Sequence, residues 1–247
     1  MKDIAIRLEN IGKTFTVYEK TTDSIRERFF NIFQANHRRK IEALKNVNLE
    51  IERGEFFGIV GRNGSGKSTL LKIILGALQP DPGGAVEVNG RIIRLALGMG
   101  FDPELSARNN VYLNASLLGL SFKQIGQKFR EIIEFAELEQ FVDTKIKFYS
   151  SGMYSRLAFS IAVHAEADIF LMDEFFGGVG DSRFKEKSEK VFEESLVKGR
   201  TIVHVGHNLE MIKKHCDRVL VLNYGNPVGI GKPEEMIREY KQIMQHP

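Results

Sequence analysis

The sequence has little cysteine and no long apolar run. Cys216 is the only cysteine among 247 residues, so no internal disulfide can form and nothing requires an oxidising compartment. No stretch approaches the roughly 18 to 20 uncharged apolar residues that cross a bilayer. Charged residues stand near the N-terminus, where a signal peptide needs an apolar run. We therefore expect a chain that neither spans a membrane nor is exported, with the cytoplasm as its compartment.

The charge balance is mild, because 35 basic residues stand against 32 acidic ones. Without a concentrated basic patch, this balance argues against nucleic acid as a partner. A hydrophobic fraction of 43% in a chain of this length can bury one core, which excludes a disordered tail or a small stapled scaffold. The sequence has no repeat and no low-complexity tract, so we expect residues 1–247 to form a single domain.

Short apolar runs that are typical of strands recur along the chain. They stand at residues 4–8, 47–51, 56–60, 169–172, 201–205 and 218–222. The first two runs alternate apolar and polar residues, which predicts half-buried antiparallel strands. The third, fourth and fifth runs are almost continuously apolar, which favours parallel strands covered by helices on both faces. The pattern predicts an α/β fold whose mixed sheet core carries an antiparallel β subdomain.

Two segments interrupt this alternation. Residues 20–42 combine arginine and lysine with isoleucine and phenylalanine at a spacing that places an apolar stripe on one helical face. This predicts an inserted, basic amphipathic element. Residues 103–142 carry apolar residues at helical intervals, broken by Gly119 and Gly126, which predicts an inserted α-helical subdomain that extends to about residue 165.

A glycine-rich segment follows the apolar run that ends at Val60. It reads Gly61-Arg62-Asn63-Gly64-Ser65-Gly66-Lys67-Ser68-Thr69, and apolar residues at helical spacing come next. Between a strand and a helix, such glycines let backbone N–H groups turn onto an anion, and the helix adds its positive end. Lys67 supplies a charge for the β and γ phosphates, and the Ser68 hydroxyl can ligate Mg²⁺. The segment predicts a nucleoside triphosphate site, with a ligand-free turn as the alternative.

A magnesium site needs a second anchor, and the run at 169–172 offers one at its carboxyl end. Asp173 follows this buried strand, and its carboxylate would hold Mg²⁺ through the second coordination shell. Glu174 comes next and is the candidate for orienting or deprotonating the attacking water. The alternative for this acidic pair is a helix cap or a solvated turn.

Between these motifs stands Tyr149-Ser150-Ser151-Gly152-Met153-Tyr154-Ser155-Arg156, at the start of a helical pattern. Serines and a glycine at a helix start form a further anion site, which one triphosphate pocket does not need. A plain capped helix is the alternative. The order of the three motifs resembles the nucleotide-binding domains of ATP-binding cassette (ABC) proteins, which are P-loop NTPases, and in them this segment is the signature motif.

The resemblance implies functional roles for residues that match the family pattern. Two such domains pair head to tail in the family, so Ser150, Ser151, Gly152 and Met153 of one chain would face the γ phosphate held by the other chain's Lys67. Asp181 matches the loop that contacts the partner domain. His207 matches the histidine that contacts the γ phosphate and positions the water. An aromatic ring near the N-terminus should stack on adenine. Phe15 matches its position better than Tyr18, although both stay open.

Finer details narrow the resemblance. Three short motifs look like those of ATP-binding subunits of O-antigen, capsule or teichoic-acid exporters. They are Tyr-Ser-Ser-Gly-Met at 149–153, the segment 101–106 and Val-Gly-Asp at 179–181. This implies a homodimeric, Mg²⁺-dependent ATPase that binds ATP and is attached peripherally to the cytoplasmic side of the membrane. Its partner would be a separate membrane subunit, and the glycan would be reached indirectly. In that group the basic insertion lies close to the membrane-embedded partner.

The sequence also departs from the family pattern. No glutamine stands between Gln79 and Gln124, so the loop near 97–102 lacks the glutamine that usually senses Mg²⁺. Asp102 stands where this branch more often has histidine. We expect no C-terminal carbohydrate-binding domain, because the chain stops at Pro247.

Three alternatives stay open: an importer, a soluble cassette ATPase acting on nucleic acid or ribosomes, and a cassette that binds ATP without hydrolysing it. The soluble class usually has two cassettes or a long coiled coil, and this chain has neither. Intact Lys67, Asp173, Glu174 and His207 argue against the non-hydrolysing class.

Overall fold

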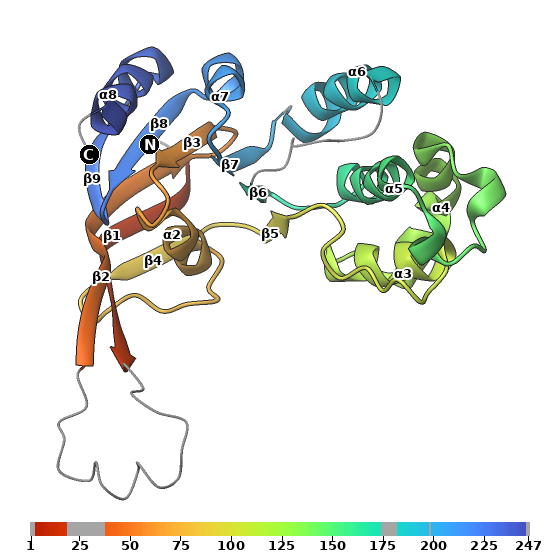
Figure 1. Cartoon of the computed structure of the whole chain (residues 1–247), viewed down its shortest axis with the longest axis horizontal. Coiled ribbons are helices and arrows are strands. Elements are labelled where there is room, and N and C mark those ends of the chain that lie inside the picture. Colours follow the sequence, from red (N-terminus) through yellow and green to blue (C-terminus); the bar gives the residue numbers. More distant parts are fainter. Residues whose placement is uncertain (1–2, 19–37, 174–181, 198, 246–247) are drawn as a thin grey trace, which may run out of the picture.

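The computed structural model describes residues 3–18, 38–173, 182–197 and 199–245 (Figure 1). Its elements follow the chain in the order β1 (Ile4–Tyr18), β2 (Arg38–Glu52), β3 (Phe56–Gly61), α2 (Lys67–Ile74), β4 (Ala85–Val88), β5 (Ile92–Leu95), α3 (Ala107–Leu117), α4 (Phe122–Ala136), η1 (Glu139–Phe141), η2 (Ile146–Phe148), α5 (Ser151–Val163), β6 (Ile169–Asp173), α6 (Ser182–Val191), η3 (Phe192–Val197), β7 (Thr201–Val205), α7 (Leu209–His215), β8 (Arg218–Asn223), β9 (Asn226–Gly231) and α8 (Pro233–Gln245).

The strands form two sheets. β1 pairs with β2 and β4 in an antiparallel sheet, and the remaining strands form a sheet of order β5-β6-β7-β3-β8-β9. Strands β5, β6, β7, β3 and β8 run parallel, and β9 adds an antiparallel edge. The almost continuously apolar runs became β3, β6 and β7, which are buried because α2 and the antiparallel sheet cover one face and the other helices cover the opposite face. The predicted mixed sheet and antiparallel β subdomain are confirmed.

Two hydrophobic cores fill the two faces of the larger sheet. Successive side chains of a strand point to opposite faces, so Phe57 and Ile59 pack in one core and Phe56 and Val60 in the other. The first core includes α2 and the antiparallel sheet. The second includes helices α3 to α8. Burial of these apolar side chains is the main stabilising contribution to the fold.

Within the helical segment, a glycine and a capping box mark the break between α3 and α4. Ser121 and Gln124 form a capping box at the start of α4, which satisfies free backbone N–H groups there. Gly119 separates α3 from α4 at a φ of 84°, as expected of a break. The predicted break at Gly126 is wrong, because α4 runs through it. A Cβ there would lie 3.6 Å from the hydroxyl of Tyr112, so a small residue suits the packing of α4 on α3.

The end of the predicted amphipathic insertion is a strand. Residues 38–42 belong to β2, which pairs with β1 as far as Tyr18 and Arg38. The helical interpretation of these last residues is wrong, because cross-strand pairing replaces the helical period. Residues 20–37 lie outside the described ranges. In the described part of the chain, no helix is long and apolar enough to cross a bilayer.

Candidate nucleotide-binding site

The glycine-rich segment folds as a loop between β3 and α2. β3 ends at Gly61, and Gly66 is the N-cap of α2. Gly66 has a φ of 102°, and a Cβ built on it would lie 2.4 Å from the carbonyl oxygen of Ala43. A Cβ on Gly61 would lie 2.3 Å from the carbonyl oxygen of Leu222. The loop therefore requires glycine at both positions, because neither leaves room for a side chain.

The loop borders a cavity of about 930 Å³ together with two strand ends. Asp173 is the last residue of β6 and His207 follows β7, and both line this phosphate cavity. Parallel β3, β6 and β7 end at one edge of the sheet, so segments far apart in the sequence meet there. The other lining residues are Ala43, Gly61, Arg62, Asn63, Gly64, Ser65, Gly66, Lys67, Ser68, Thr69, Val205, Gly206, Tyr240 and Met244. The structure thus brings the whole predicted loop together with Asp173 and His207.

Lys67 places its ammonium group over the loop. Its Nζ donates hydrogen bonds to the carbonyl oxygens of Gly61 at 2.6 Å and Arg62 at 2.9 Å. The backbone N–H groups and the dipole at the start of α2 add positive potential. Within the described structure, the buried Oγ of Ser65 has no hydrogen-bond partner. This concentration of donors and positive charge suits a phosphate group.

Asp173 is the only acidic residue among the described residues that line the phosphate cavity. Its carboxylate and the Ser68 hydroxyl offer oxygen donors, which Mg²⁺ prefers. No group of three or more His, Cys, Asp or Glu in the described ranges could hold a metal alone. Mg²⁺ often completes its shell with water and substrate phosphates, so the donors present fit a metal that arrives with a nucleotide. Arg94, which the sequence analysis did not single out, donates from Nη2 to Oδ2 of Asp173 at 2.9 Å.

Two histidines of this region have different surroundings. His207 lines the cavity, and the next residue, Asn208, accepts a hydrogen bond from the N–H of Met211 and caps α7. His204 on β7 is buried beside Phe56. Burial lowers the pKa of His204 to about 4, so its imidazole is neutral at ordinary pH. His204 is a core residue, and His207 faces the site.

The predicted signature residues lie away from the phosphate cavity. Ser150 is the N-cap of α5, and its Oγ accepts a hydrogen bond from the N–H of Met153 at 3.2 Å. α5 packs on α3 and α4, and in Figure 1 this helical part stands apart from α2. Ser150, Ser151, Gly152 and Met153 are absent from the residues that line the cavity. One chain therefore does not bring them to its own phosphate loop.

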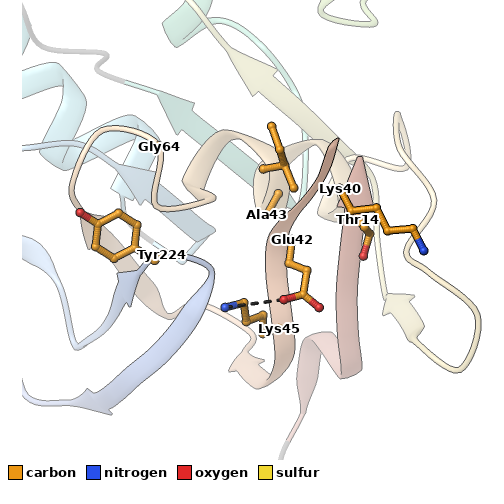
Figure 2. Close-up of a pocket in the computed structure, with 8 residues that line it drawn as sticks. Thr14, Lys40, Glu42, Ala43, Lys45, Gly64 and Tyr224 are labelled. Atoms are coloured by element: carbon orange, nitrogen blue, oxygen red, sulfur yellow. Dashed lines mark ion pairs between the residues drawn. The ribbon is translucent and has the colours of Figure 1, made fainter. Parts of the chain in front are cut away.

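A second cavity of about 660 Å³ adjoins the first at Gly64. Figure 2 shows it between Tyr224 and the arm formed by β1 and β2. Its lining residues are Thr14, Lys40, Ile41, Glu42, Ala43, Lys45, Gly64 and Tyr224. Ala43 and Gly64 line both cavities, so a ligand with its phosphates in the first could extend into the second.

The aromatic residues near this second cavity differ from the predicted ones. Phe15 pairs with Ile41 across β1 and β2, but it lines neither cavity. The side chain of Tyr18 lies outside the described part of the structure. Tyr224 lines the second cavity, and the guanidinium of Arg62 lies 5.9 Å from its ring centroid. Sequence reasoning missed Tyr224, because a Tyr-Gly pair after a strand signals only a hairpin turn.

Helix α8 also reaches the site. Tyr240 and Met244 line the phosphate cavity, although the sequence analysis assigned them no role. No local signal could have found them, because the direction in which a helix crosses a sheet depends on tertiary packing. Glu174 and Asp181 fall within 174–181, outside the described residues, so the structure does not place them.

The loop expected to carry a glutamine is tied to the helical segment. The hydroxyl of Tyr154 on α5 donates to the carbonyl oxygen of Gly98 at 3.2 Å, and Asn114 on α3 donates to that of Met99. The carboxylate of Asp102 accepts a hydrogen bond from the N–H of Glu104 at 2.9 Å. Asp102 therefore stabilises the turn before α3, which accounts for aspartate at this position.

Comparison with known proteins agrees with this geometry. Residues 44–177 match the ABC transporter family model. The teichoic acids export ATP-binding protein TagH of Lactococcus lactis is 40% identical over 98% of this chain, which spans 52% of that relative. The O-antigen export system ATP-binding protein RfbB of Klebsiella pneumoniae is 40% identical over 97% of this chain, which spans 98% of that relative. The solved dimeric structure of the ATP-binding cassette MJ0796 with ADP and Pi has a TM-score of 0.68 and 27% identity, covering 92% of this chain and 98% of that one.

A phosphate loop, a strand-end carboxylate and an inserted helical segment on this mixed sheet define an ATPase of the ATP-binding cassette class. The chain belongs to the ABC transporter family. The resemblance inferred from the three motifs is thereby confirmed.

Proposed function

We propose that this chain is the ATP-hydrolysing subunit of an exporter that moves cell-surface polysaccharide, of O-antigen, capsule or teichoic-acid type, across the cytoplasmic membrane. A separate transmembrane subunit would form the path, and this chain would bind it peripherally on the cytoplasmic side. The observation that carries the ATPase part is the meeting of the phosphate loop, Asp173 and His207 at one cavity. The export part rests on relatives whose names state export of teichoic acids and O-antigen.

In this proposal the chain binds and orients a triphosphate for attack by water. The loop N–H groups and Lys67 bind the β and γ phosphates. Ser68 and Asp173 would hold Mg²⁺, which would neutralise charge on the phosphate oxygens. Glu174 orients or deprotonates the water, and His207 contacts the γ phosphate. Positioning and electrostatics supply most of the acceleration in phosphoryl transfer, so these side chains need no covalent step.

The active form in this proposal is a homodimer. The start of α5 presents Ser150, Ser151 and Gly152 with free backbone N–H groups, but it lies away from the phosphate cavity of its own chain. A head-to-tail partner would bring these groups to the γ phosphate, and Asp181 would contact that partner. Dimeric structures of the cassette MJ0796 support this arrangement. Loss of the γ phosphate removes contacts from the closed state, so hydrolysis opens the dimer.

Force would pass to the membrane subunit through the helical segment. The loop at 98–100 links β5 to this segment and is held to α3 and α5 by Asn114 and Tyr154. A change at the sheet edge would therefore move the loop and the helices together. The basic residues of 20–42 would add contact with the membrane subunit or with anionic lipid.

A membrane pull-down with an ATPase assay tests the proposal. We expect the tagged chain to co-purify with a multi-spanning polysaccharide-export protein and to hydrolyse ATP with Mg²⁺, and we expect Glu174→Gln to abolish hydrolysis. Recovery with a permease that is served by an external binding protein would indicate import. Recovery with ribosomes or nucleic acid would move the chain to the soluble cassette class. Hydrolysis that persists unchanged in Glu174→Gln would remove Glu174 from the mechanism.

A further inference from the structure

Arg94 reaches the carboxylate that the proposed function assigns to the metal. β5 and β6 are parallel neighbours in which Arg94 stands opposite Leu171, so its side chain lies on the same sheet face as Asp173. From there Nη2 of Arg94 donates to Oδ2 of Asp173 at 2.9 Å. Arg94 is not among the residues that line the phosphate cavity, so it approaches the carboxylate from outside the cavity.

This ion pair does little for the stability of the sheet. Backbone pairing already joins β5 to β6 from Ile92 to Leu95. The side chains of Arg94 and Asp173 are 36% and 24% exposed, and water screens ion pairs of that exposure strongly. The buried Nε of Arg94 also has no hydrogen-bond partner in the described structure, so the guanidinium is incompletely satisfied. Because the pair stabilises the sheet little and leaves Nε without a partner, we look for its role at the carboxylate of Asp173 rather than in the stability of the sheet.

Among the described residues that line the cavity, the pair occupies the only acidic group. A divalent cation that arrives with a nucleotide needs the negative potential of Asp173, and the guanidinium reduces that potential. The loop that follows β5 contributes no glutamine that could contact the metal, because no glutamine stands between Gln79 and Gln124. Arg94 is therefore the side chain of β5 best placed to govern how Asp173 meets a metal.

We propose that Arg94 is a built-in counter-ion that competes with Mg²⁺ for Asp173. In the nucleotide-free chain the guanidinium holds the carboxylate, and metal-nucleotide loading weakens this pair. Arg94 thus acts as a positioning residue that raises the Mg²⁺ concentration at which the metal-dependent part of nucleotide binding saturates. This inference rests on the proposed nucleotide site, and it concerns the metal step alone.

The test measures binding of the fluorescent, non-hydrolysable analogue mant-AMPPNP, first in EDTA and then across a Mg²⁺ titration. Arg94→Met should bind the analogue in EDTA within about twofold of the wild type, and its Mg²⁺ midpoint should fall by at least about threefold, because one competing charge is gone. Arg94→Lys keeps the charge and should remain near the wild-type midpoint. Arg53→Met is the matched control, because Arg53 is about as exposed as Arg94 and pairs with an aspartate, Asp3, outside the cavity.

Each negative outcome of the binding test overturns a different claim. If the wild type binds no analogue with or without Mg²⁺, the proposed nucleotide site itself is wrong. If binding occurs but the midpoint of Arg94→Met is unchanged or higher, the counter-ion inference is wrong. Arg94→Gln serves as a second neutral variant. If both neutral variants lose binding in EDTA while the wild type retains it, Arg94 is needed for the fold or the nucleotide, which also overturns the inference.

Discussion

His207, which follows β7, lines the phosphate cavity, whereas His204 within β7 is buried in the core beside Phe56. His204 stands opposite Met172 in the β6–β7 register, and Met172 belongs to the core that contains α5 and α6. The two imidazoles therefore lie in different environments, although they are close in the sequence.

Exchanging each histidine should separate these roles. His207→Ala should lower the hydrolysis rate by about 100-fold or more, because the proposed interaction with the transferred phosphoryl group is lost. His204→Leu should stay within about twofold of the wild-type rate, because a buried ring with no hydrogen-bond partner among the described residues is replaced by an apolar side chain of similar size. Phosphate release measures the rate, and nucleotide binding checks that both variants fold. Equal losses in the two variants would contradict this division.

His204 also predicts how stability depends on pH. Burial lowers its pKa to about 4, below the value near 6.5 of an unfolded chain, with Asp173 opposing the shift and His215 adding to it. The unfolded state therefore binds the proton more readily. Stability from neutral His204 is complete above about pH 6.5 and is lost as the pH falls towards 4, to a total of about 3 kcal/mol.

Urea unfolding at several pH values between 7.5 and 4 measures this loss. His204→Leu should lose less stability than the wild type over that range, because the leucine does not titrate. If the wild type and the variant lose stability in parallel, the decline belongs to other groups, among them His164 and His215, whose pKa values are also lowered chiefly by burial.

The second cavity predicts where the base of the nucleotide lies. The family resemblance offers Phe15 and Tyr18 for stacking, with Phe15 the better match, whereas the second cavity is lined by Tyr224. We expect Tyr224→Ala to weaken ATP binding by about fivefold or more, because stacking of a base on one ring contributes about 1–3 kcal/mol. Phe15→Ala, on a ring outside both cavities, should weaken binding less. Equilibrium binding of a fluorescent ATP analogue checks both. Phe122→Ala, on an exposed ring at the start of α4, is the control and should leave affinity unchanged.

The sequence predicted the parts of the site that depend on local patterns. Residues 61–69 and Asp173 follow runs whose apolar character marks buried strands, so both the loop and the carboxylate could be placed at strand ends. Arg94 could not be found in this way, because its pairing with Asp173 depends on the register between β5 and β6. Tyr240 and Met244 needed the path of α8, which packing sets.

The wrong predictions have a shared physical origin. The sequence pattern predicts a helix break at Gly126, but the capping box at Ser121 and the packing of α4 near Tyr112 outweigh the low helix propensity of one glycine. The apolar spacing predicts an amphipathic helical face that includes residues 38–42, but pairing with β1 decides their structure. In both places tertiary contacts override a local preference, which a single sequence does not display.

Mixing two inactive variants tests the head-to-tail dimer. Lys67→Met damages the phosphate loop, and Ser151→Arg places a bulky charge at the start of α5. Each variant alone should hydrolyse no ATP, because every composite site has one damaged half. A mixed dimer contains one site with an intact loop from one chain and an intact α5 from the other. The mixture should therefore regain up to about a quarter of wild-type hydrolysis when the sites act independently.

The matched control mixes Lys67→Met with Asp173→Asn, because both lesions lie in the same half of the site and no intact site can form. Regain of activity in the first mixture but not in the second requires that the phosphate cavity of one chain works with the α5 of another. If neither mixture regains activity while cross-linking shows that mixed dimers form, the two halves do not complement each other across chains. For Ser151 to contact a bound phosphate, α5 would then have to move a long way towards the phosphate cavity of its own chain.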